Sequence, residues 1–117
     1  SSAYIDRAFV TYSNNAKHEL LNVKRDTLEE FGAVSEQTVI EMAAGACKAA
    51  NADIGIAISG IAGPGGATEG KPVGLVWFGL QINGKHWVFE QVFDGDRAQV
   101  RLQAIVFSLK TIIEKIK

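Results

Sequence analysis

The first residues able to do chemistry follow a β-branched, aromatic segment, in the stretch from residue 11 to residue 17. Tyr12 and Lys17 are five residues apart across a predicted turn, so their side chains can converge on one cleft. A lysine in a partly apolar pocket loses its proton more readily, and the neutral amine can act as a base for a hydroxyl nucleophile. The alternative interpretation is a solvated helix lysine beside a tyrosine whose hydroxyl lies in water.

A glycine-rich stretch from residue 59 to residue 72 is the second candidate site. Five of the 12 glycines lie between Gly60 and Gly70. Because glycines carry no side chain, the backbone N–H groups around Gly60, Gly63, Gly65 and Gly66 can approach a ligand closely. A loop after a buried strand is a common place for an α/β protein to hold an anion or a nucleotide. The alternative interpretation is a long flexible turn between strands.

The same stretch almost matches a phosphate-binding P-loop. Gly65, Gly70 and Lys71 fit G-x-x-x-x-G-K, but Pro72 stands where a Ser or Thr hydroxyl would bind magnesium. The residues after it are β-formers, whereas a P-loop leads into a helix. The glycine spacing also differs from G-x-G-x-x-G. These departures exclude a nucleoside triphosphatase and leave a dinucleotide fingerprint without support.

The third candidate is the sequence Asp-Gly-Asp-Arg at residues 94–97, which predicts a turn into the N-terminus of a helix. Backbone donors and the Arg97 guanidinium would suit a phosphate there. The alternative interpretation is that Asp96 only caps the helix and Arg97 lies on a solvated face. Cys47 lies on a predicted apolar helix face and is interpreted as a core residue.

Composition limits the function classes. The 117 residues, 47% of them hydrophobic, predict one globular domain over 1–117. The net charge of -1 argues against a nucleic-acid partner, and no apolar run reaches the length of a membrane span. A single cysteine fits a cytoplasmic location and excludes an internal disulfide. The two histidines lie far apart, so no metal site and no cofactor are expected.

Turn and cap signals predict the elements that position these candidates. Strands are expected over residues 7–12, 54–58, 73–80 and 85–93, with Asn83-Gly84 as a hairpin turn. Helices are expected from a Ser13 or Asn14 cap to 21, from 26 to 31, from the Ser35 cap to 50, and after the Asp96 cap. This order predicts an α/β fold, a three-layer α/β/α sandwich with a mixed β-sheet.

Hydrophobic periodicity also predicts which faces are buried. The strand over 54–58 is apolar on both alternations and is expected to be covered on both faces. One face of the third helix is apolar from Val39 to Ala50. The stripe expected to turn the last helix toward the core comprises Leu102, Ile105, Val106, Leu109, Ile112, Ile113 and Ile116.

Five motifs in order over almost the whole chain carry a family resemblance. They are VTYSNxAK at 10–17, GAVSE at 32–36, ISGIAGPGG at 58–66, KPVG at 71–74 and GDR at 95–97. Together they resemble the C-terminal domain of the competence-damage-inducible (CinA) protein family. The resemblance implies a nicotinamide-nucleotide amidase, which hydrolyses the carboxamide of nicotinamide mononucleotide to nicotinic acid mononucleotide and ammonia in pyridine nucleotide salvage.

The resemblance also implies roles for individual residues. Ser2, in the Ser-Ser-Ala-Tyr stretch at 1–4, matches the serine nucleophile, and Lys17 and Tyr12 match the residues that activate it. The glycine loop, with Gly60, Gly63, Gly65 and Gly66, matches the substrate cradle, and Arg97 matches a basic residue of the site. Amide hydrolysis needs a nucleophile, a base and oxyanion donors, so these roles require no metal. Whether Lys17 or Tyr12 takes the serine proton stays open at this point.

The chain departs from the family at its beginning. Family members carry a further N-terminal segment, and residues 1–117 are expected to lack its strand and helix. If that segment is truly gone, weak or no activity is expected of residues 1–117 alone. The alternative function is a non-catalytic pyridine-nucleotide-binding or regulatory domain; a partner-binding subunit without a ligand leaves the glycine loop unexplained. The resemblance further implies a homodimer or a larger homo-oligomer.

Overall fold

The computed structural model describes residues 8–11 and 13–117. Three strands form one sheet in the order β1-β2-β3, namely β1 (Ile54–Gly60), β2 (Leu75–Ile82) and β3 (Lys85–Val92). Both strand pairs are antiparallel, with Ile58 opposite Phe78 and Phe78 opposite Phe89. Asn83 and Gly84 make the predicted hairpin turn between β2 and β3, both with positive φ.

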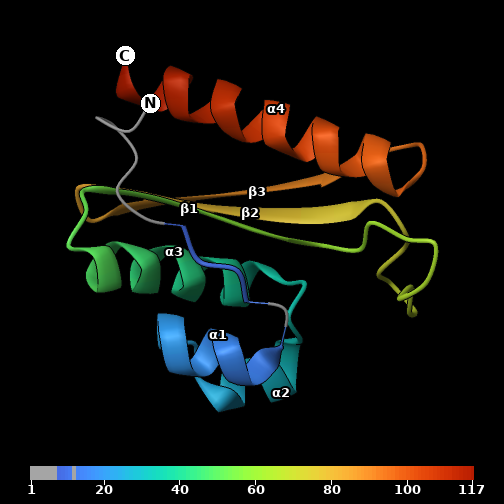
Figure 1. The fold of residues 1–117 in the computed structure, drawn as a ribbon, viewed down its shortest axis with the longest axis horizontal. Coiled ribbons are helices and arrows are strands. Elements are labelled where there is room, and N and C mark those ends of the chain that lie inside the picture. The colour runs from blue at the N-terminus through green and yellow to red at the C-terminus, as the bar shows by residue number, and fades with distance from the viewer. Residues whose placement is uncertain (1–7, 12) are drawn as a thin grey trace.

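Helices cover both faces of this sheet (Figure 1). On one face α3 (Glu36–Ala50) contacts all three strands, and α1 (Asn14–Leu21) and α2 (Arg25–Phe31) pack on α3. On the other face α4 (Arg97–Ile116) packs on β2. The α/β class and the placement of helices on both faces are therefore confirmed.

The described strands are all antiparallel, whereas the sequence predicted a mixed sheet. That prediction depended on a strand over residues 7–12, and residues 8–11 have no regular secondary structure. Phe9 packs instead against the helix-side core cluster. A β-forming composition gives a strand only where a neighbouring strand is available to pair with it, because strand stability comes from cross-strand contacts.

Capping side chains begin three of the helices where the sequence places them. Ser13 Oγ accepts a hydrogen bond from Ala16 N, and Ser35 Oγ accepts one from Thr38 N. Asp96 and Gln99 form a reciprocal capping box at the start of α4. Because each cap satisfies backbone donors that have no partner within the helix, these residues set where the helices begin.

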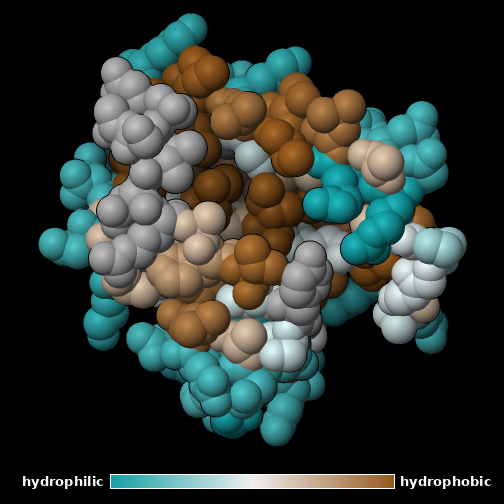
Figure 2. Space-filling view, viewed as in Figure 1, coloured by the Kyte–Doolittle hydropathy of each residue, from teal (hydrophilic) through white to brown (hydrophobic). Residues whose placement is uncertain are grey.

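The buried face of α4 is not the predicted one. Val100, Ala104, Ser108 and Thr111 are buried, and they pack toward a cluster that includes Phe78, Phe89 and Phe93. Six of the seven residues of the predicted stripe are exposed, with Leu109 at 57% and Leu102 at 63%, and Ile112 is half-buried. Figure 2 shows these apolar side chains running along α4 at the top of the molecule. Phe107 of α4 also meets this face of the sheet, with its ring centroid 4.5 Å from that of Phe78.

The sheet face beneath α4 is covered only in part. Ile54 and Ile58 of β1 are 43% and 39% exposed, whereas Gly55 and Ala57, on the α3 side, are buried. The expectation that this strand is covered on both faces is therefore wrong for the α4 side. No helix in the described part of the chain is long and apolar enough to cross a membrane.

Two truncations on α4 test this orientation. Val100→Ala should lower the free energy of unfolding by about 2 kcal/mol, because two buried methyl groups are lost and a cavity remains. Leu109→Ala should change it by less than about 0.5 kcal/mol, because that side chain is already exposed. Urea unfolding of both variants measures the difference. A larger loss from Leu109→Ala than from Val100→Ala would show that the other face of α4 is buried.

Candidate active site

Lys17 is the most unusual titratable residue in the described chain. It lies in the first turns of α1 and is only 6% exposed. Its Nζ donates a hydrogen bond of 2.6 Å to the backbone carbonyl of Thr11. Burial lowers the pKa of Lys17 below the ordinary lysine value of 10.5, because the charged ammonium loses hydration. The structure therefore excludes the alternative of a solvated helix lysine.

The local sequence explains why Lys17 is held there. Ser13 caps the start of α1, and Asn22 ends it in the left-handed conformation with φ of 58°. Gly45 of α3 lets α1 approach closely, since a Cβ at that position would lie 1.7 Å from Leu21 O. Lys17 is therefore fixed by a helix that is capped at one end and packed against α3 at the other.

The glycine loop follows the end of β1. Some of its positions require glycine because of close packing, and others because of a positive φ. At Gly60 an added Cβ would lie 2.8 Å from Val76 Cγ2, so packing explains the residue. Gly63 and Gly66 have φ of 84° and 95°, which side chains rarely adopt. Gly65 has open space within 4 Å of an added Cβ and no positive φ. Neither packing nor backbone conformation requires glycine at 65, whereas a closely approaching ligand would.

Arg97 reaches this loop from the first turn of α4. Its Nη1 donates to the carbonyl of Gly63 across 3.4 Å, a long contact that leaves the guanidinium largely available. The side chain is exposed. Asp96 caps the helix, as one interpretation of the sequence held, and Arg97 is exposed but also contacts the loop.

The α2–α3 turn contacts both ends of the loop. Ser59 Oγ donates to Ala33 O at 2.8 Å, and Lys71 Nζ donates to Phe31 O at 2.7 Å. Sequence reasoning did not identify either residue as part of the site. The available signals were the motifs at 58–66 and 71–74, which contain these residues, and the position of Lys71 in the incomplete P-loop pattern. None of these signals identified the partners, because every residue type has a backbone carbonyl.

The structure brings some of the predicted residues together and leaves others untested. Arg97 and Gly63 are in contact, and in Figure 1 the glycine loop, the α2–α3 turn and the first turn of α4 lie at one end of the sheet. Lys17 is joined to Thr11 and, within the described residues, makes no hydrogen bond to the loop. Ser2 and Tyr12 lie outside the described residues.

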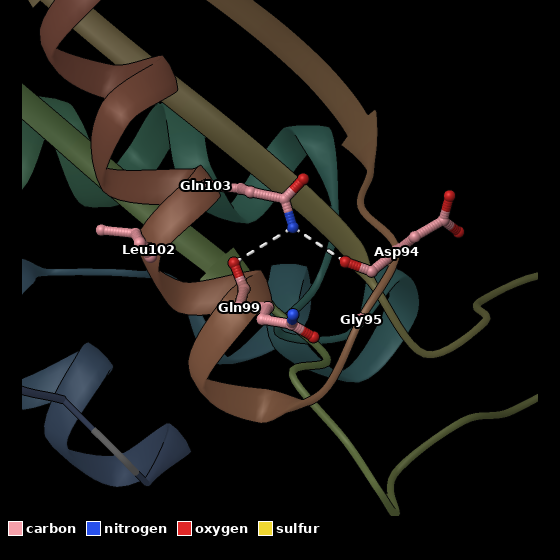
Figure 3. A pocket seen from close by; sticks show the side chains of 5 residues that line it. All are labelled: Asp94, Gly95, Gln99, Leu102 and Gln103. Atoms are coloured by element: carbon pink, nitrogen blue, oxygen red, sulfur yellow. Dashed lines mark hydrogen bonds between the residues drawn. The ribbon is translucent and has the colours of Figure 1, made fainter.

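A depression in the described surface lies beside the start of α4. It has a volume of about 420 Å³ and is lined by Asp94, Gly95, Gln99, Leu102 and Gln103. Figure 3 shows the amide of Gln103 pointing between two backbone carbonyls, and its Nε2 donates to Asp94 O at 2.8 Å and to Gln99 O at 3.1 Å. Both donors of the Gln103 amide are therefore used within the protein, and this side chain has none left for a ligand.

Neither a metal site nor a cysteine nucleophile finds support in the described residues. These residues contain no cluster of three or more His, Cys, Asp or Glu side chains that could hold a metal ion. Cys47 is buried, and burial together with the nearby Asp53 charge raises the pKa of its thiol. A thiol with a raised pKa holds its proton and is a poor nucleophile.

Known proteins resemble this chain over almost its whole length. The family model described as the CinA C-terminal domain matches residues 1–116. A nicotinamide-nucleotide amidohydrolase PncC of Enterobacter agglomerans is 58% identical over 116 residues, covering 98% of this chain and 71% of that relative. The PncC of Escherichia coli strain K12 is 51% identical and covers 96% of this chain and 68% of its own length.

A solved structure shares the fold. The competence/damage inducible protein CihA from Agrobacterium tumefaciens superimposes with a TM-score of 0.95 at 42% sequence identity. The match covers 99% of this chain and 72% of that one. The structural comparison and the sequence comparisons therefore both point to competence-damage-inducible proteins and their relatives.

Proposed function

Because the chain belongs to the CinA C-terminal domain family, we propose that it hydrolyses the carboxamide of nicotinamide mononucleotide to nicotinic acid mononucleotide and ammonia. The PncC relatives named as nicotinamide-nucleotide amidohydrolases support this substrate. Lys17 is the residue on which the proposal rests most heavily, since a buried amine with a lowered pKa suits a base.

We assign the first proton transfer to Lys17. A neutral amine has two N–H groups and one lone pair, so it can donate to Thr11 O and still accept a proton. In the proposed step the hydroxyl oxygen of Ser2 bonds to the carboxamide carbon, and its proton passes to Lys17 Nζ. The roles of Ser2 and Tyr12 stay predictions from the family motif.

The following steps return the enzyme to its starting state. Backbone N–H groups of the glycine loop would stabilise the oxyanion on the carboxamide oxygen. When the carbon–nitrogen bond breaks, the protonated Lys17 gives its proton to the departing amide nitrogen, which leaves as ammonia. Water then attacks the acyl carbon while neutral Lys17 Nζ takes one of its protons. The bond between that carbon and the Ser2 oxygen breaks as Lys17 passes the proton to this oxygen, and nicotinic acid mononucleotide leaves.

Arg97 and the helix N-terminus behind it are proposed to hold the substrate phosphate. The guanidinium carries a permanent charge and donates in a planar fork that suits phosphate oxygens. Its long contact with Gly63 O costs little to give up, so the side chain can turn toward an anion. This arrangement would need no metal, and a homodimer or larger assembly in the cytoplasm stays a prediction.

The lowered pKa of Lys17 predicts how the rate depends on pH. Protonated lysine cannot accept a proton, so kcat/KM should rise as pH increases through the pKa of Lys17 and then level off. Burial places this rise below the ordinary lysine value of 10.5. A pH series of kcat/KM measures it. A rate that falls with increasing pH over this range would contradict a neutral Lys17 base.

Chromatographic separation of the products tests the proposed function. The protein should convert nicotinamide mononucleotide to nicotinic acid mononucleotide, and Ser2→Ala should bind the nucleotide in calorimetry without converting it. Wild-type protein that binds the nucleotide but forms no product would favour the alternative of a binding or regulatory domain.

A further inference from the structure

Two sequence motifs have no role in the proposed chemistry, namely GAVSE at 32–36 and KPVG at 71–74. The structure joins them. Lys71 Nζ donates to Phe31 O, just before the first motif, at 2.7 Å across 40 residues of sequence. Ser59, at the other end of the glycine loop, donates to Ala33 O at 2.8 Å. Both ends of the loop are therefore tied to the same short turn.

The end of α2 is a favourable place for a lysine. Phe31 is the last residue of α2, and carbonyl groups in the last turn of a helix have no partner within it. These carbonyls carry the partial negative charge of the helix C-terminus, which attracts an ammonium group. Lys71 thus satisfies a carbonyl that α2 leaves unpaired.

Gly32 makes room for this contact. Its φ is 78°, and a Cβ at this position would lie 3.0 Å from Lys71 Nζ. The carbonyl of Gly32 accepts hydrogen bonds from Ser35 Oγ at 2.8 Å and from Thr38 Oγ1 at 2.7 Å. The turn is therefore fixed to the first turn of α3, and it gives Lys71 a rigid anchor.

Lys71 is in turn coupled to the loop backbone. The backbone N–H and carbonyl of Lys71 exchange two hydrogen bonds of 3.0 Å with those of Thr68. Arg97 contacts the loop near its other end, at Gly63. The segment between Gly63 and Thr68 is thus coupled to the α2–α3 turn through Lys71, whereas its contact with α4 at Gly63 is long.

We propose that Lys71 is a positioning residue that clamps the glycine loop to the α2–α3 turn and so orients the loop's N–H groups toward the nucleotide substrate. The identity of the substrate rests on the proposed function; the clamp itself does not. Without Lys71 the loop should sample more conformations, and ordering it on binding should weaken substrate affinity. Lys71 itself need not touch the reacting atoms.

Lys71→Met tests the clamp, with Lys85→Met as the matched control on the exposed hairpin between β2 and β3. Lys71→Met should raise KM for nicotinamide mononucleotide by roughly tenfold, the effect of one charge-assisted contact. It should lower kcat as well, because the N–H groups that the clamp orients are also proposed to stabilise the oxyanion. Lys71→Arg should restore part of the affinity, since a guanidinium can also donate to Phe31 O.

Amide hydrogen exchange of the free protein separates the clamp from the proposed activity. Lys71→Met should speed exchange in residues 60–71 and leave the sheet unchanged, and Lys85→Met should alter neither. Loop exchange equal to wild type in Lys71→Met, or a fall in kcat with KM unchanged, would overturn the proposal. If wild-type protein does not hydrolyse the nucleotide, the proposed function fails, and the exchange result alone decides whether Lys71 holds the loop.

Discussion

Lys17→Met should lower kcat for nicotinamide mononucleotide hydrolysis by at least about a hundredfold, the usual contribution of a general base. Methionine fills a similar volume, but its side chain has no amine to accept the serine proton. The buried amine is also costly to keep charged, so its removal should not lower the free energy of unfolding. Stopped-time assays of product formation, with thermal unfolding of the same samples, measure both quantities.

The matched control for this prediction is Lys24→Met. Lys24 is exposed and precedes α2 with no side-chain cap bond, so its replacement should leave kcat within about twofold of wild type. If Lys17→Met kept more than a tenth of the wild-type rate, Lys17 would not be the base, and the family motif would leave Tyr12 as the candidate.

Gly45→Ala should destabilise the fold strongly and displace Lys17. The change gains about 1 kcal/mol of helix propensity within α3. It also places a Cβ 1.7 Å from Leu21 O, which forces α1 away from α3. Overpacking against backbone costs about 3 kcal/mol or more, so the clash dominates and the free energy of unfolding should fall by about 2 kcal/mol or more. Because Lys17 lies on α1, activity should fall as well.

Gly65→Ala provides the contrast, because a Cβ at that position meets open space. Its free energy of unfolding should stay within about 0.5 kcal/mol of wild type, while KM for the nucleotide should rise if the loop lies against the substrate. Urea unfolding and steady-state kinetics of both variants test the pair. Equal stability of Gly45→Ala and Gly65→Ala would show that α1 does not pack on α3 as described.

Local signals in the sequence predicted the element boundaries well. Ser13, Ser35 and Asp96 cap helices where expected, and Asn83-Gly84 turns the hairpin, because caps and tight turns depend on neighbouring residues only. Residues 8–11 failed as a strand because pairing is a long-range property. The same limit explains α4, whose apolar period identified a helix but not the face that meets the aromatic rings of the sheet.

The sequence predicted those parts of the candidate site that depend on the type of side chain. The Asp96 cap placed Arg97 at the start of a helix, whereas its contact with Gly63 of the loop was not predicted. The burial of Lys17 was not predictable from spacing, since it depends on how α1 packs against α3. Ser59 and Lys71 were missed because each bonds a backbone carbonyl from a distant part of the chain, and every residue type has that carbonyl.

Ammonia release from nicotinamide mononucleotide in the presence of EDTA, compared between the wild-type protein and Lys17→Met, tests the central claim most directly. We predict that wild-type protein releases one ammonia for each nicotinic acid mononucleotide formed, that EDTA does not slow the release, and that Lys17→Met abolishes it. No release by wild-type protein, release that EDTA stops, or release that persists in Lys17→Met would contradict a metal-independent amidase that depends on Lys17.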